Sequence, residues 1–411
     1  MSCVFAAPML CSCRRRFASG LAGLIMVASQ IWATPTAAIT IQFDYSYDAA
    51  GFFGTASAPT PARTALEFAG RAFAPFTDSL AAIQPSGGNL WSAEFRNPGT
   101  GIATNISNLL VPQDAIIVFA GARNLADAEI GRAEIGGYRF PAGSNPSIAF
   151  ADAVVNRGQG GFTDDFAPWG GVIQFDTTSS GGAARSWHFD LNSSPPSNKY
   201  DFLTTACHEL AHLLGFGTST AFTADVATSL FVGSNASNLY RGPIPLNWDD
   251  LRQDSQHWGP EVSSPPFVSG WQSKPSLGPT LPAGERRLFT PLDYAALADI
   301  GWAITPELLQ LPGDVDGDHH VDGSDFLKWQ RNLGGFGGSP GDVNGDLVVD
   351  LYDGWVVRQN FGALGSASGL INPTSLAVPE PGAAVLIAGL VAMLSALRGP
   401  ARNRAQRSER L

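Results

Sequence analysis

The stretch His208-Glu209-Leu210-Ala211-His212-Leu213-Leu214-Gly215 decides the fold. A helical pattern leads into it and a glycine ends it, so we expect a helix over residues 200–214. Helical residues turn by about 100° each, which places His208 and His212 on one face, where both can bind one ion. Glu209 can then act as a general base on metal-bound water, which predicts a Zn²⁺ site. Two surface histidines on an ordinary helix are the alternative.

The segment His208–Gly217 also resembles the metzincin peptidases, in which HExxHxxG ends the active-site helix at a glycine. Family members usually have a third histidine three residues after that glycine, and this chain has Thr218 there. Residues Thr290–Trp302 are similar to the helix that closes metzincin domains of the matrixin and serralysin kind. The resemblance covers roughly residues 170–302 and implies a zincin-like domain.

A third zinc ligand must come from elsewhere in the chain, because a hydroxyl is a poor ligand for zinc. The six histidines are at 188, 208, 212, 257, 319 and 320, and the last two belong to a C-terminal repeat. Leishmanolysin-like metzincins place their third histidine far downstream, so we predict His257, in Asp254-Ser255-Gln256-His257-Trp258. A structural role beside the packing tryptophan is its alternative. The other candidate ligands are His188, Asp225 and Thr218.

Metzincins carry a methionine under the zinc, and this chain departs from that pattern. Its methionines, at 1, 9, 26 and 393, all lie in predicted sorting segments. If a turn forms around Ser273–Ser276, another side chain must lie under the site. Two hypotheses follow: a zinc-dependent endopeptidase that cleaves a peptide or protein substrate, and a catalytically inactive zincin-like surface binding protein. An intact Glu209 favours the first, because an inactive site has no use for that carboxylate.

The remaining pattern predicts an α+β domain over residues 39–303, which by the resemblance is a zincin-like catalytic domain with a twisted mixed sheet and an active-site helix. Strand patterns occur at 39–45, 114–120, 171–176 and 186–190, and helical patterns at 61–82, interrupted by Pro75, and at 291–300. Residues 217–285 have weak periodicity and many Pro, Gly and Ser residues, which is typical of functional loops. We expect substrate-binding loops there.

Residues 313–325 and 341–353 repeat one pattern 28 positions apart. Oxygen-bearing side chains occupy positions 1, 3, 5 and 12 of each copy, as in a loop that wraps Ca²⁺, and a backbone carbonyl is available at position 7. The predicted calcium ligands are Asp314, Asp316, Asp318, His320 and Asp325 in the first copy, and Asp342, Asn344, Asp346, Val348 and Asp353 in the second. An acidic solvated linker is the alternative.

Each loop precedes a predicted helix, at Phe326–Leu333 and Gly354–Phe361, and the pair resembles a dockerin. The resemblance implies a small all-α calcium-binding module over residues 304–363, with a cohesin-like protein as a possible partner. Position 6 favours Gly because φ is positive there, yet the copies have His319 and Leu347. We therefore expect weak calcium binding, especially in the second loop.

Both ends of the chain predict sorting segments. Residues 1–38 have arginines, an apolar run and small residues, as a signal peptide does, with cleavage near Ala38 or Ala33. Residues 379–411 have an apolar run and then arginines, and resemble the PEP-CTERM signal that an exosortase-type enzyme removes. A membrane anchor is the alternative at either end. Residues 364–378 predict a linker. The protein is expected to be exported, to the cell surface or the extracellular space.

The composition narrows the partners further. With 25 basic and 36 acidic residues, the chain is not suited to nucleic acid, which requires a basic surface. Three of the four cysteines precede the predicted cleavage site, so Cys207 alone would remain and no disulfide scaffold can form. We expect Cys207 to pack in the helix rather than to act as a nucleophile or ligand.

Overall fold

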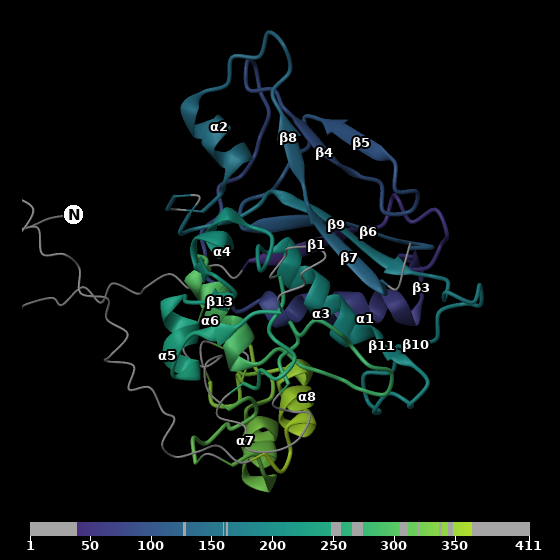
Figure 1. Ribbon diagram of the computed structural model, residues 1–411, viewed down its shortest axis with the longest axis vertical. Coiled ribbons are helices and arrows are strands. Elements are labelled where there is room, and N and C mark those ends of the chain that lie inside the picture. The colour runs from purple at the N-terminus through teal and green to yellow at the C-terminus, as the bar shows by residue number, and fades with distance from the viewer. Residues whose placement is uncertain are drawn as a thin grey trace, which may run out of the picture. The chain divides into compact units, whose positions relative to one another are not determined.

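The computed structural model describes residues 39–363 apart from 126–128, 159, 162, 248–255, 265–273, 305–310, 319, 337–338 and 344–347. The predicted signal peptide, linker and C-terminal sorting segment lie outside the described residues. Within them the fold is α+β, with a mixed sheet and eight α-helices (Figure 1). Among the residues that the structure describes, no helix has the length and apolar character that crossing a membrane requires.

The central sheet has the strand order β1-β6-β9-β7. Strands β1 (Thr40–Asp44), β6 (Ala115–Arg123) and β9 (Gly170–Asp176) are parallel, which confirms the strands expected at 39–45, 114–120 and 171–176. Strand β7 (Gly131–Ile135) is antiparallel to β9 at the sheet edge. It was not predicted, because its half-buried residues include Arg132 and Glu134 and show no strong apolar pattern.

The central strand β6 is buried on both faces, as is typical of parallel strands. Its even-numbered residues from Ile116 to Ala122 belong to the core that contains helices α1 (Pro61–Gly70) and α3 (Phe202–Leu213). Ile117 and Phe119 point to the other face and belong to a second core. Successive side chains of a strand alternate between faces, so β6 joins the two layers.

Helix α1 is shorter than its sequence pattern. Thr60 caps its N-terminus, and Pro61 occupies the first turn, where a missing N–H is tolerated. The helix ends at Gly70 and one 3₁₀ turn, Arg71–Phe73, follows before Pro75. The apolar spacing predicted a continuation towards residue 82, but the chain forms no helix there. Leu80 is nevertheless buried.

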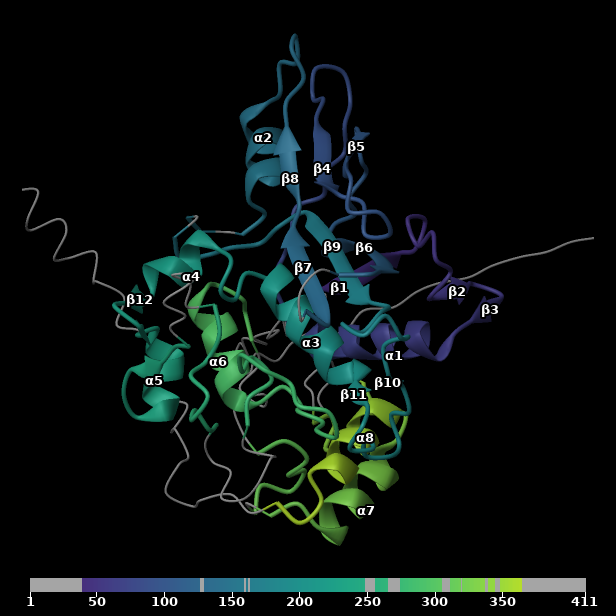
Figure 2. The same cartoon turned by 45° about the vertical axis from the view of Figure 1, so that its right-hand side comes forward.

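A second, antiparallel sheet covers the other face of the central sheet, as Figure 2 shows. It contains β5 (Ala103–Ser107), β4 (Ser92–Arg96) and β8 (Gly137–Arg139) in that order, next to α2 (Ile148–Val155). Its core is aromatic, with Phe95 stacked on Phe119 at 4.5 Å between ring centroids. The sequence patterns did not predict this layer.

Helix α3, which carries His208 and His212, begins close to the predicted position, after a short parallel pair of strands, β10 (Trp187–His188) and β11 (Tyr200–Asp201). Asp201 is its N-cap and accepts hydrogen bonds from the backbone N–H of Thr204 and from Arg286. Asp201 is fully buried and Arg286 is 4% exposed, so this ion pair fixes the start of the helix in the core.

The segment 217–285 contains short elements instead of a purely irregular loop. These are α4 (Thr220–Ala224), α5 (Ser234–Tyr240) and a small antiparallel sheet of β12 (Val226–Ala227), β13 (Leu230–Phe231) and β14 (Ile244–Pro245). Helix α6 (Pro291–Asp299) follows close to the predicted position, with a capping box formed by Thr290 and Asp293. A further hairpin near the N-terminus pairs β2 (Gly54–Thr55) with β3 (Ala58–Pro59).

The C-terminal repeat forms two helices, α7 (Gly323–Asn332) and α8 (Leu351–Gln359). Both begin three residues before their predicted starts, because Asp322 and Asp350 cap them. The small apolar core between the helices contains Val321, Trp329, Val349 and Val357.

Candidate metal centre

The structure brings three histidines together. The Nε2 atoms of His208 and His212, both on α3, are 3.0 Å apart, and each is 3.2 Å from Nε2 of His257. Three nitrogens bound to one tetrahedral zinc at about 2.0–2.1 Å would lie roughly 3.3 Å from each other. The group therefore has the dimensions of a zinc site and can hold a metal ion.

Backbone carbonyls orient two of these rings. Nδ1 of His208 donates a hydrogen bond to the carbonyl of Ser276 at 2.8 Å, and Nδ1 of His212 donates to the carbonyl of Phe216 at 2.8 Å. With the proton on Nδ1, the lone pair of each Nε2 points to the centre of the group. Burial, and then the neighbouring His212, lower the pKa of His208 to about 3, so its ring is in the neutral, metal-binding form.

His257 reaches the group because the chain approaches the end of α3 closely. Gly217 has a φ of +71°, and a Cβ there would lie 2.6 Å from the carbonyl oxygen of Gln256. Only glycine allows this approach. The next residue, Trp258, is fully buried and packs against Phe216 with ring centroids 4.9 Å apart. The alternative for His257 was a structural role beside this tryptophan. In the structure the buried tryptophan instead holds His257 next to His208 and His212.

Asp293 binds two residues that position His257 and His208. Its carboxylate is fully buried and accepts hydrogen bonds from Nε1 of Trp258 at 2.9 Å and from the backbone N–H of Ser276 at 3.0 Å. Trp258 adjoins His257, and the carbonyl of Ser276 orients His208. Burial raises the pKa of Asp293, and these hydrogen bonds oppose the shift. Sequence reasoning gave this residue no role, although Thr290-x-x-Asp293 is visible as a cap pattern.

Glu209 lines the same cleft as the three histidines and contacts the edge strand β7. Its side chain is 7% exposed, and its carboxylate accepts a hydrogen bond from the backbone of Ala133. Burial raises the pKa of Glu209 to about 8. A Cβ on Gly131 would lie 2.8 Å from its Oε1, so this glycine makes room for the carboxylate. The predicted general base is therefore next to the metal group.

The three histidines and Glu209 line one cleft of about 820 Å³. Strand β7 forms part of the wall, with Gly131, Arg132 and Ala133, and residues between Ser276 and Leu281 form another part. Thr218, Asn247 and Gln256, from the segment predicted to bind substrate, also line it. A cleft of this size accommodates an extended segment of a ligand.

The other candidates for the third ligand make other contacts. The hydroxyl of Thr218 donates to the carbonyl of His212 at 2.5 Å, and the Nε2 of His188 is 2.9 Å from the carbonyl of Ser193. Asp225 is the C-cap of α4, and burial raises its pKa. Among the described residues, His188 and Asp225 do not belong to the histidine group. Thr218 lines the same cleft, where its hydroxyl makes the hydrogen bond to His212.

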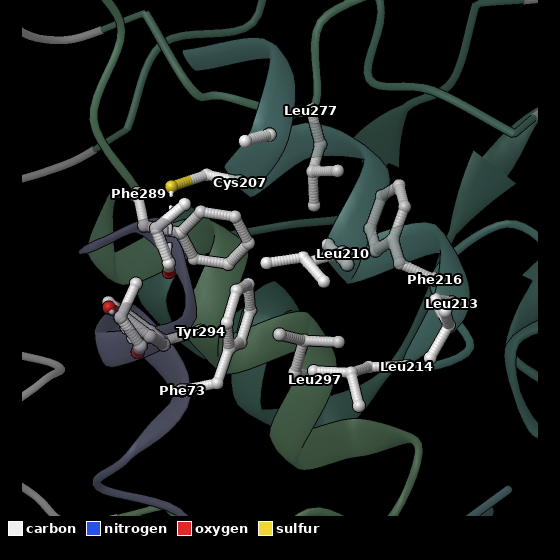
Figure 3. Packing of buried hydrophobic residues seen from close by; sticks show 14 of the residues in the cluster. Phe73, Cys207, Leu210, Leu213, Leu214, Phe216, Leu277, Phe289, Tyr294 and Leu297 are labelled. Carbon is white, nitrogen blue, oxygen red and sulfur yellow. Dashed lines mark hydrogen bonds between the residues drawn. The ribbon is translucent and has the colours of Figure 1, made fainter. Parts of the chain in front are cut away.

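An apolar layer lies on the inner side of α3, and Leu277 belongs to it (Figure 3). Leu277 is fully buried directly after Ser276, and its carbonyl accepts the backbone N–H of Trp258 at 2.9 Å. It directly follows the segment Ser273–Ser276, around which a turn was expected with a side chain other than methionine under the site. Cys207 lies in the same layer, where burial raises the pKa of its thiol, as expected for a packing residue.

The first predicted calcium loop gathers three carboxylates. Oxygens of Asp314, Asp316 and Asp325 lie close enough together to hold a metal ion. Burial, and then the carboxylates of Asp325 and Asp318, raise the pKa of Asp316. Asp318 is not part of this group, and its Oδ1 accepts the backbone N–H of His320 at 2.9 Å. The carbonyl of His320 stays a predicted ligand.

The second loop is described only in part. Asn344 and Asp346 lie outside the described residues, as do His319 and Leu347, the residues at position 6 of the two loops. Asp353 is fully buried and its Oδ1 accepts the backbone N–H of Val343 at 2.9 Å, as Oδ1 of Asp325 accepts that of Val315 in the first loop. The predicted ligands Asp342, Val348 and Asp353 thus belong to a loop that repeats the first one in this hydrogen bond.

Comparison of the chain with protein-family models, with curated proteins and with solved structures finds no match. The case for function therefore depends on the geometry described above.

Proposed function

We propose that this chain is an exported zinc-dependent endopeptidase with a metzincin-like, zincin-type catalytic domain. The observation that carries the proposal is the convergence of His208, His212 and His257, at nitrogen separations that suit zinc, next to the buried Glu209. An isolated pair of surface histidines would have neither the third ring nor the oriented tautomers.

The residues of the cleft divide the reaction between them. When bound, Zn²⁺ supplies a Lewis acid for the scissile carbonyl and acidifies a water molecule. Glu209 would accept the proton of that water as a carboxylate and deliver it to the leaving amine. Burial alone favours the protonated form of Glu209, and the positive charge of a bound cation would favour the carboxylate instead. Strand β7 has a strand neighbour on one side only among the described strands, so its free edge can align an extended substrate by strand addition.

The rest of the chain fits the same proposal. Asp314, Asp316 and Asp325 would bind Ca²⁺ in a dockerin-like module, with a cohesin-like protein as an external partner. The N-terminal segment would direct export, and an exosortase-type enzyme would remove the C-terminal sorting segment. The protein would then remain at the cell surface or outside the cell. Leu277 would replace the methionine of the metzincin turn as apolar support.

The test is hydrolysis of casein by the zinc-loaded protein and its Glu209→Gln variant. Loss of a general base is expected to lower the rate by roughly 10²–10⁴-fold. Glu129→Gln is the matched control, because Glu129 lines the same cleft but pairs with Arg132 at 2.6 Å. Its rate should stay close to that of the unchanged protein. Equal rates for the Glu209→Gln variant and the unchanged protein would exclude the proposed role of Glu209.

The second candidate is a catalytically inactive zincin-like surface binding protein. The lack of any methionine between residues 39 and 363 favours it, since the expected sulfur is missing under the site. This candidate predicts bound zinc with no cleavage that depends on Glu209. The same casein assay, combined with metal analysis, therefore separates the two candidates.

A further inference from the structure

The two C-terminal repeats have the same framework. Asp322 and Asp350, 28 positions apart, cap α7 and α8, and each helix begins with a capping box. Val321 and Val349, also equivalent, are both buried in the small core between the helices. The repeats are therefore matched in the parts that form the module.

They differ on one helix face. Helix α8 presents Tyr352, Trp355 and Val356, which we call the docking face, at the positions where α7 has Ser324, Leu327 and Lys328. The docking face is 6–8% exposed and belongs to the apolar core that contains α1 and α3. Its counterpart on α7 is not covered in this way, since Leu327 is 49% exposed.

Aromatic contacts join the docking face to the domain of residues 39–303, which carries the histidine group and is called the zinc domain below. The ring of Phe68, on α1, lies 4.9 Å from that of Tyr352 and 5.0 Å from that of Trp355. The indole N–H of Trp355 donates to the carbonyl of Leu191 at 2.8 Å. The cavity beside these contacts measures only about 40 Å³, and Cys207 of α3 is one of its lining residues. This is the close packing of a protein interior.

Charged residues surround the aromatic contacts. Arg71, at the end of α1, forms an ion pair with Asp350, and its guanidinium lies 5.0 Å from the centre of the Tyr352 ring. Arg358 donates to the side-chain oxygen of Asn192 at 2.7 Å. An aromatic centre with a charged rim is the composition of a specific interface. Residues 39–363 also fall within one compact unit.

We propose that the second repeat is an intramolecular partner of the zinc domain: its docking face completes the surface formed by α1 and residues 187–192, and it transmits calcium binding in the module to the stability of that domain. The calcium part of this inference rests on the calcium loops proposed above. The repeats thus have different roles, and a protein that bound the docking face would have to displace the zinc domain.

The test compares hydrogen exchange in the full chain with Trp355→Ala and with Leu327→Ala, the equivalent change in α7. Trp355→Ala is expected to speed exchange in α1 and in residues 187–192 by about tenfold or more, because a buried aromatic contact is lost. Leu327→Ala should leave both segments unchanged. Equal exchange of α1 in the two variants would overturn the proposal.

A second variant covers the case in which Trp355→Ala does not fold. Arg71 lies on the zinc domain, and its side chain is partly exposed. Arg71→Glu places a second negative charge beside that of Asp350. It is expected to speed exchange in α8, on the other side of the interface. Exchange of α8 at the unchanged rate would contradict the docking.

Calcium removal tests the transmission. EGTA is expected to speed exchange in both α8 and α1 of the unchanged protein, and to have no further effect on α1 in Trp355→Ala. Faster exchange in α8 alone would show that the two helices are not coupled, and would overturn the inference. If EGTA affects neither helix, the calcium proposal fails instead, and the Trp355→Ala result alone decides the docking. Neither readout depends on peptidase activity.

Discussion

The histidine group and the first proposed calcium loop are assembled in different ways. His257 comes from a segment 45 residues after His212, and buried contacts hold it in place. Asp314, Asp316 and Asp325 come from one twelve-residue loop, whose own backbone amides bind the carboxylate of Asp325. A site built from distant segments depends on its supporting framework, whereas a loop site depends mainly on its own ligands.

The largest expected effect is on that framework. Asp293→Ala removes the acceptor of several buried N–H groups, among them those of Trp258 and Ser276, and should cost about 3 kcal/mol or more in the free energy of unfolding. Zinc binding should weaken as well, because the carbonyl of Ser276 orients His208. Urea unfolding and zinc analysis measure the two effects.

Asp299→Ala is the control for this change, because Asp299 ends the same helix. Its carboxylate accepts the N–H groups of Asn235 and Ala236 at the start of α5, away from the histidines. Loss of that cap should cost about 1 kcal/mol and leave zinc binding unchanged. If both variants lose zinc equally, general destabilisation explains the loss, and Asp293 has no special supporting role.

The next effect concerns the distant ligand itself. His257→Ala should lower zinc affinity by more than the roughly 10–100-fold that loss of an outer partner costs. His188→Ala is the matched control, since this buried histidine contacts the carbonyl of Ser193 and is not part of the group. Competition with a zinc chelator measures both. Unchanged affinity in His257→Ala would mean that the metal uses another third ligand.

The comparison also explains what the sequence could predict. The spacing of His208 and His212 is set by one helical turn, and that of the calcium ligands by one loop, so both are visible locally. His257 was reached only by eliminating other histidines and by the leishmanolysin resemblance. The roles of Asp293 and the carbonyl of Ser276 depend on contacts between distant segments, for which no local pattern exists.

The same limit applies to the fold. The strands of the parallel core were predicted for two reasons. Strands β6 and β9 form continuous apolar runs because they are buried on both faces, whereas the residues of β1 alternate between apolar and polar. The strands β7, β5 and β8 were missed, since their residues are half-buried or exposed and show no strong apolar pattern. Strand β4 is mostly buried, but polar residues interrupt its apolar ones. Yet β7 forms a wall of the cleft. The part of the fold that borders the cleft was therefore the least predictable.

A smaller effect is expected at the calcium loop. Asp316→Asn removes one charge from the carboxylate group and should weaken Ca²⁺ binding by about tenfold, since ligand charge sets the affinity of such loops. Asp318→Asn should have less effect, because Asp318 is not in the group. Calorimetric titration measures both affinities. Equal losses would show that both carboxylates bind the ion, as the loop pattern alone predicts.

The smallest effect is expected at Leu277, next to Ser276, where Leu277→Met would introduce the methionine that the proposed metzincin resemblance implies. Swaps that conserve volume usually cost less than about 1.5 kcal/mol, and Leu277 lies in an apolar layer with Leu210 and Phe216 (Figure 3). If the site needs only apolar support at this position, the rate of casein hydrolysis and the zinc content should stay unchanged. Leu213→Met, in the same core, controls for the general cost of such a swap. A severalfold higher rate in Leu277→Met alone would show that sulfur contributes to the site, and that its framework differs from the calcium loop in chemistry as well as in assembly.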